Sequence, residues 1–247
     1  MTDPFIISAI LLTFLLAGAV KGVIGLGLPT VSLGLMTAVL DLPSAMALMV
    51  VPSAVTNIWQ ASAGGNGMLL IRRLWPFLIM ATVTIWFGAQ ALAKVDLDWL
   101  SALLGLLLIA YAGLNLAGVR LSIGPSRETV AGPAFGVVNG VLTGMTGSFV
   151  VPGVLFLQAI GLPRDQLVQA MGMLFSLSTL ALAVALGTGG LWTAELGAAS
   201  ALSVLPAIVG MVVGARIRGR LSEAAFRRVF FLSILVLGAY IVTRAVL

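Results

Sequence analysis

The sequence contains neither cysteine nor histidine among its 247 residues. Without cysteine the chain has no disulfide, no thiolate metal site and no cysteine nucleophile. Without histidine it lacks the commonest metal ligand and the commonest general base. An enzyme would need a base and a nucleophile that no motif here supplies, so we expect a protein that is not an enzyme and that holds no metal or cofactor.

Charged residues are also scarce. They make up 9% of the chain, and hydrophobic residues make up 60%, against about 25% and about 45–50% in soluble domains. Apolar runs recur along the whole length, and about 20 such residues cross a bilayer core as a helix. The composition therefore predicts an all-α integral membrane protein, a single polytopic domain over residues 1–247 with the lipid bilayer as its surroundings.

The formal net charge is +5. In membrane proteins an excess of Lys and Arg usually marks the loops on the cytoplasmic side. We therefore interpret the charge as a topology signal and expect no binding to nucleic acid.

Two pairs of apolar runs are too short to cross a membrane as single helices: 5–20 with 28–40, and 130–145 with 149–162. A glycine-rich turn interrupts each pair, and its glycines match at one offset: Gly18, Gly22 and Gly25 with Gly140, Gly144 and Gly147. Further matches follow in the same order: Leu42-Pro43 with Leu162-Pro163, Pro76 with Pro206, Gly88-Ala89 with Gly214-Ala215, and Ala110-Tyr111 with Ala239-Tyr240. Such an ordered series indicates two homologous halves, repeat 1 at about residues 1–119 and repeat 2 at about residues 128–247.

Each half then consists of a broken helix pair followed by three transmembrane helices, and two topologies are open. If each pair crosses once as a kinked helix, the repeats are parallel and the basic loop residues divide almost evenly between the two sides. If each pair is a re-entrant hairpin, the repeats are inverted and only Lys94 and Arg244 lie opposite the other basic loop residues. Those others are Arg72, Arg73, Arg120, Arg127, Arg164, Arg216, Arg218, Arg220, Arg227 and Arg228. The positive-inside rule favours the hairpins, which place both termini in the periplasm.

The interruptions also predict a binding site. Non-helical backbone at membrane depth must be buried in protein or line a wet cavity, so we expect the turns to face inward. Pro29 and Pro152 suit the first position of a helix, and each should open a returning half-helix whose free N–H groups favour an anion. Broken segments at matching places in two halves are typical of a transporter's binding site near the midplane.

Polar side chains near the interruptions complete this predicted site. Lys21 is the only charged residue within a broken segment, and nearby hydroxyl and amide groups would add neutral hydrogen bonds. The predicted substrate-binding residues are Lys21, Gly25, Gly27, Pro29, Thr30, Asn57, Gln60, Gly144, Thr146, Gly147, Ser148 and Pro152. Three alternatives stay open: the glycine pairs pack helices closely, Asn57 and Gln60 hydrogen-bond between helices, and Lys21 snorkels to an interface.

These motifs resemble those of the sulfite exporter TauE/SafE proteins, a large group of prokaryotic permeases. The resemblance rests on Gly18-x-x-x-Gly22-x-x-Gly25-x-Gly27-x-Pro29, on Gly140-x-x-x-Gly144-x-x-Gly147 with Pro152, and on the Leu-Pro that follows each pair. It covers essentially the whole chain. It implies transport of small sulfur-containing anions, such as sulfite and organosulfonates, across the bacterial cytoplasmic membrane.

The sequence therefore predicts an anion permease, with export as the expected direction. No acidic residue lies within an apolar span except near an end, so a carboxylate proton relay is not visible. Two alternatives stay open: a non-transporting subunit of a membrane complex, and a permease for another small anion. The oligomeric state is also open, with a homodimer among the options.

Overall fold

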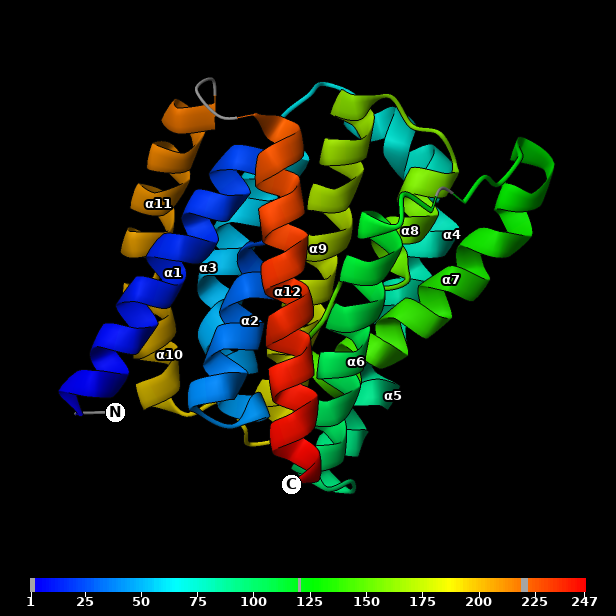
Figure 1. Cartoon of the computed structure of the whole chain (residues 1–247). Coiled ribbons are helices and arrows are strands. Elements are labelled where there is room, and N and C mark those ends of the chain that lie inside the picture. Colours follow the sequence, from blue (N-terminus) through cyan, green and yellow to red (C-terminus); the bar gives the residue numbers. More distant parts are fainter. Residues whose placement is uncertain (1–2, 120, 219–221) are drawn as a thin grey trace. The chain divides into compact units, whose positions relative to one another are not determined.

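The structure is a computed structural model that describes residues 3–119, 121–218 and 222–247 (Figure 1). Within these ranges it contains helices and no strand, which confirms the predicted all-α class. The helices are α1 (Pro4–Ile24), α2 (Leu28–Val39), α3 (Leu42–Ser62), α4 (Gly67–Val83), α5 (Ile85–Ala89), the 3-10 helix η1 (Gln90–Ala93), α6 (Leu97–Leu116), α7 (Pro125–Thr146), α8 (Gly153–Ala159), α9 (Arg164–Thr188), α10 (Ala194–Leu202), α11 (Val204–Ile217) and α12 (Glu223–Val246). Arg120 and Arg220, which the topology prediction uses, lie outside the described residues.

Seven helical stretches among the described residues are long and apolar enough to cross a membrane. They are α1, α3, α4 together with α5 and η1, α6, α9, α10 together with α11, and α12. The apolar helix α2 has only 12 residues and is shorter than a span. The lengths and composition of these helices are those of a multi-pass membrane protein, as predicted.

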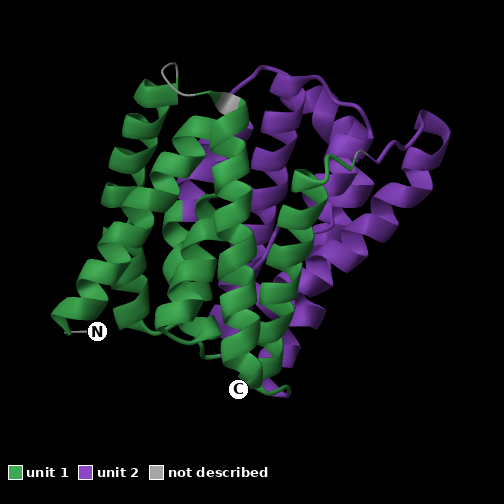
Figure 2. Cartoon of the chain, in the orientation of Figure 1, with its two compact units in different colours: residues 1–52, 95–119, 190–247 green, residues 53–94, 120–189 purple. Residues whose placement is uncertain are grey.

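The helices form two compact units (Figure 2). Unit 1 comprises Met1–Pro52, Val95–Val119 and Gly190–Leu247, and unit 2 comprises Ser53–Lys94 and Arg120–Gly189. Each unit takes helices from both predicted halves, so the division into units does not follow the boundary between the halves. The boundaries of the two repeats stay a prediction.

In unit 1, α1 lies against α11 through glycines (Figure 1). A Cβ atom on Gly18 would lie 2.1 Å from the carbonyl oxygen of Ala207, and one on Gly22 would lie 2.2 Å from that of Met211. These neighbours are backbone atoms, which cannot move aside as a flexible side chain could. The absence of a side chain therefore allows the two helices to approach this closely.

In unit 2, α7 lies against α4 and α5 in the same manner. A Cβ atom on Gly140 would lie 2.5 Å from the Ala81 carbonyl oxygen, and one on Gly144 would lie 2.1 Å from that of Ile85. The glycines that we match between the halves thus occupy corresponding packing positions in two interfaces. A duplicated sequence would account for this correspondence.

A proline inside α3 is accommodated by a neighbouring helix of unit 1. Pro52 has no N–H to donate to the carbonyl of Leu48, four residues earlier. The hydroxyl of the buried Ser200, in α10, donates to that carbonyl at 2.7 Å and accepts from the Val51 N–H at 3.1 Å. The carbonyl that proline frees is therefore satisfied by protein, as an apolar environment requires.

Each glycine-rich interruption is the turn of a helical hairpin. In unit 1 the chain runs out along α1 and returns along α2 toward the end where the N-terminus lies (Figure 1). In unit 2 the Ile123 N–H, just before α7, donates to the carbonyl of Ala159 at the end of α8, at 2.9 Å. Each broken pair is therefore a hairpin within its unit and not one kinked helix.

The lengths of the hairpin arms differ from the prediction. α1 has 21 residues and α7 has 22, although we expected short arms at 5–20 and 130–145. α8 has only seven residues, although we expected an arm at 149–162. α1 is longer because it continues past the apolar run to the left-handed Gly25. α7 is longer mainly because it begins five residues earlier than predicted, at Pro125, and it ends at the left-handed Gly147.

Replacing Gly22 with alanine should destabilise the protein by about 1–3 kcal/mol, because the added methyl group would overlap backbone atoms of Met211 and Ala215. The unfolding midpoint of the purified protein in detergent, followed by the circular dichroism of its helices, measures the effect. The matched control is Gly113→Ala in α6, where an added Cβ has no neighbour within 4 Å. Equal midpoints for the two variants would contradict the requirement for glycine at this interface.

Candidate functional site

The first break lies in unit 1 between α1 and α2. Gly25 ends α1 with a φ of 79°, and Gly27 precedes α2 with a φ of 110°. Both values lie in the left-handed region, which favours glycine because it has no Cβ atom. The Gly25 N–H donates to the Lys21 carbonyl at 2.8 Å and closes the last turn of α1. Local backbone geometry thus explains why two glycines stand at this turn.

The start of α2 presents free backbone donors. Pro29 lies in its first turn, as predicted, and the Val31 N–H donates to the Gly27 carbonyl at 2.8 Å. Among the described residues, no hydrogen-bond partner is found for the N–H groups of Leu28 and Thr30. Unsatisfied N–H groups and the positive end of the helix dipole together favour a negative solute at this end. Thr30 is buried, at 3% exposed.

Lys21 lies in the last turn of α1 and is buried, at 5% exposed. A positive charge is favourable at a helix C-terminus because the terminal carbonyl groups carry partial negative charge. Its burial does not fit the alternative in which the ammonium group snorkels to a polar surface. A buried basic group therefore lies one turn before the break.

At the second break, in unit 2, hydroxyl groups form hydrogen bonds with the backbone of the turn. Gly147 ends α7 with a φ of 74°. The Thr143 hydroxyl donates to the Ser148 carbonyl at 2.9 Å, and the Thr146 hydroxyl donates to the Leu142 carbonyl at 2.7 Å. The Ser148 N–H donates to the Thr146 Oγ1 at 3.2 Å. The Thr146 hydroxyl proton, which we expected to serve a substrate, is therefore used by the backbone of its own helix.

The start of α8 differs from the prediction. Pro152 is the residue before the helix, and α8 begins at Gly153. The Gly153 N–H donates to the Asn139 Oδ1 at 2.8 Å, and the Val154 N–H donates to the Val150 carbonyl at 2.9 Å. A side chain of α7 and the turn itself therefore occupy the first two N–H groups of α8, which we expected to be free.

Asn139 is a residue that the sequence reasoning missed. It is fully buried in α7, and its Nδ2 has no hydrogen-bond partner among the described residues. A single asparagine within the apolar run 130–145 is the signal that could have identified it, since a polar group in such a run needs a partner. The corresponding position of the first half holds Ala17, so the two turns are chemically different.

Asn57 and Gln60 lie on α3, within unit 2, and belong to neither turn. The Gln60 Nε2 donates to the Val168 carbonyl of α9 at 2.8 Å. The Gln169 Nε2 donates in return to the Ala61 carbonyl of α3 at 2.9 Å. This reciprocal pair supports the alternative in which Gln60 joins helices. Asn57 is fully buried.

The predicted residues thus form two groups. Unit 1 brings Lys21, Gly25, Gly27, Pro29 and Thr30 together at one turn, and unit 2 brings Thr146, Gly147, Ser148 and Pro152 together at another. Gly144 lies in the packed interface of α7 with α5. In the described part of the chain, no group of three or more acidic, histidine or cysteine side chains could hold a metal ion.

Comparison with known proteins supports one family. A search of curated proteins and a search of solved structures found no match. The family model described as "Sulfite exporter TauE/SafE" matches residues 10–241, which is nearly the whole chain. This family consists of membrane transporters and not of enzymes. The match includes both glycine-rich turns, and the chain therefore belongs to the sulfite exporter TauE/SafE family.

Proposed function

We propose that this protein exports a small sulfur-containing anion, such as sulfite or an organosulfonate, across the bacterial cytoplasmic membrane. The family supports the transport function and the class of substrate. The observation that carries the binding mode is the start of α2, where two N–H groups have no partner among the described residues and a buried lysine lies one turn before the break.

The first break supplies the main attraction for the anion. Backbone N–H groups bind a sulfonate or sulfite oxygen as they bind phosphate at other helix N-termini. Lys21 supplies a basic group one turn before the break, and the backbone N–H groups of α2 add no net charge of their own. Pro29 supports this helix start in two ways. It has no N–H that would need a partner, and its fixed φ holds the first turn of α2 in helical geometry.

The second break, which lies in unit 2, has neutral donors. The Asn139 Nδ2 is buried without a partner among the described residues, and an unused amide donor in an apolar surrounding favours a polar ligand. Ser148 is also buried at this turn. These two neutral side chains suit a polar solute that reaches the turn of unit 2.

Export of an anion needs no coupling site in this chain. An inside-negative potential drives one negative charge outward by about 2.3 kcal/mol per 100 mV. Acidic residues of the described chain lie near helix ends and not in the middle of the spans. A facilitated route that follows the membrane potential is therefore sufficient.

Purified protein in liposomes should move sulfite or a short alkanesulfonate in response to a membrane potential. Vesicles loaded with the labelled anion and clamped with a potassium ionophore should release it faster when the inside is negative. Parallel vesicles carry phosphate, acetate or an uncharged sugar, and protein-free vesicles give the leak. Faster movement of phosphate or acetate would replace the proposed substrate class, and an absence of movement in all arms would contradict the proposed function.

Substitution of Lys21 by methionine should raise the half-saturating concentration of the anion about tenfold, since a charge-assisted hydrogen bond contributes about 1.5–3 kcal/mol. Lys21→Arg should retain most of the binding. The matched control is Lys94→Met, because Lys94 is exposed and its amino group donates a hydrogen bond to the Gln90 side chain at 3.5 Å. Unchanged saturation in Lys21→Met would remove the lysine from the binding site.

The proposed topology places both termini in the periplasm. Because the chain has no cysteine, single-cysteine variants report on the side of the membrane without background. A membrane-impermeant maleimide should label Asp41→Cys from the periplasm and Arg164→Cys only after the membrane is opened. Labelling of both from the same side would contradict the inverted arrangement of the halves.

A further inference from the structure

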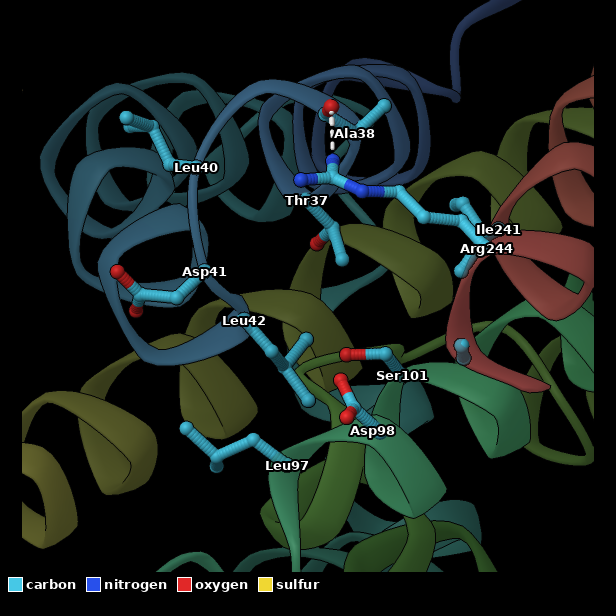
Figure 3. A pocket seen from close by; sticks show the side chains of 11 residues that line it. Thr37, Ala38, Leu40, Asp41, Leu42, Leu97, Asp98, Ser101, Ile241 and Arg244 are labelled. Carbon is cyan, nitrogen blue, oxygen red and sulfur yellow. Dashed lines mark hydrogen bonds between the residues drawn. The ribbon is translucent and has the colours of Figure 1, made fainter. Parts of the chain in front are cut away.

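A polar pocket lies at one end of unit 1, where the end of α2, the start of α3, the start of α6 and the end of α12 meet (Figure 3). Its volume is about 270 Å³, whereas a single water molecule needs only about 10–15 Å³. The pocket is therefore large enough for a small solute or a lipid headgroup. None of its lining residues belongs to either glycine-rich turn, so it is separate from the proposed transport function.

The pocket has one basic group. The Arg244 guanidinium, from α12, donates a hydrogen bond to the Ala38 carbonyl near the end of α2 (Figure 3). This bond holds the guanidinium at the pocket. The position is favourable because the carbonyl end of a helix carries partial negative charge. A guanidinium has five N–H donors, so the bond to Ala38 leaves others for a ligand.

The two carboxylates of the pocket differ in availability. Both oxygens of Asp41 are used by Ser44, whose N–H and hydroxyl each donate to one of them at 2.8 Å. The Asp98 carboxylate, in the first turn of α6, has no hydrogen bond or ion pair among the described residues. Asp98 is therefore the acidic group that is open to a ligand.

Two hydroxyl side chains lie between the basic and the acidic group. Figure 3 shows Thr37 and Ser101 directed into the space between Arg244 and Asp98. Thr37 is 6% exposed, and its Oγ1 has no hydrogen-bond partner among the described residues. A buried hydroxyl without a partner is costly, which points to a polar ligand that completes its hydrogen bonding.

We propose that this pocket binds a dipolar ion, with its acidic group on Arg244, its ammonium group on Asp98, and the hydroxyls of Thr37 and Ser101 between them. A simple anion would meet the unpartnered carboxylate of Asp98, and a simple cation would meet the guanidinium. A ligand that carries both charges satisfies both groups. The chemistry is that of an amino group and a phosphate or other acid group separated by a short chain.

Two sources could supply this chemistry. One is a free small zwitterion, and the other is the headgroup of an ethanolamine phospholipid, since the ends of membrane-spanning helices lie at the level of the headgroups. The same residues would hold either ligand. Measurements with a soluble compound and with lipids distinguish the two.

The test uses the purified full-length protein in a nonionic detergent. Thermal-shift titration compares O-phosphoethanolamine with ethanolamine and with inorganic phosphate, and native mass spectrometry compares retained phosphatidylethanolamine with phosphatidylglycerol of the same acyl chains. We expect one of the two dipolar compounds to bind at least about tenfold more tightly than its counterparts with a single charge, which corresponds to one charge-assisted hydrogen bond. Preference for the soluble compound identifies a free solute, and preference for the lipid alone identifies a headgroup.

Amino-acid substitutions test whether the ligand binds in this pocket. Arg244→Gln and Asp98→Asn should each weaken it about tenfold, and Ser101→Phe should block the pocket from α6 while leaving the bond between Arg244 and Ala38 intact. Arg216→Gln and Asp3→Asn, which change the same charges at exposed positions outside the pocket, are the controls and should bind normally. Equal binding of compounds with a single charge, no binding in either arm, or full binding in all three pocket variants would overturn the proposal.

Discussion

Every backbone N–H and C=O group in a membrane interior must find its partner within the protein, and this requirement organises the structure. At Pro52 and at the start of α8, a nearby side chain satisfies a backbone group that the helix leaves without a partner. Ser200 serves the carbonyl that Pro52 frees, and Asn139 serves the first N–H of α8. At the start of α2 the N–H groups of Leu28 and Thr30 have no partner among the described residues, which favours a negative solute there.

Close helix packing follows from a second constraint. Lipid chains are as apolar as leucine side chains, so burial of apolar surface gives helices little reason to associate. Contact between helix backbones provides dispersion energy instead, and glycine allows it. The same pattern recurs in α1 with α11 and in α7 with α4 and α5, with glycines against backbone atoms in each case. The glycine motif therefore has a packing role in addition to its role at the turns.

The two breaks share a pattern but differ in chemistry. At both breaks a long helix ends at a left-handed glycine, and the chain then returns along a shorter helix to form a hairpin. The first then opens a 12-residue helix with free N–H groups, whereas the second opens a seven-residue helix whose first donors are occupied. One source of the difference is Asn139, which accepts from the Gly153 N–H, whereas the matching position before the first turn holds Ala17. The two turns thus share a glycine pattern, with a basic residue beside the first and neutral polar residues at the second.

The sequence by itself determined the membrane class, the helical fold and the places of both breaks. The composition that indicates a membrane protein can be counted without knowledge of the fold. The left-handed turns at Gly25 and Gly147 follow from local sterics, since glycine has no Cβ atom. Tertiary structure alone decided which donors are free, because the partner of Gly153 lies 14 residues away on another helix. It also decided that each unit combines helices from both predicted halves, and that Arg244 contacts α2. Such pairings depend on contacts between distant segments, which no local pattern of residues encodes.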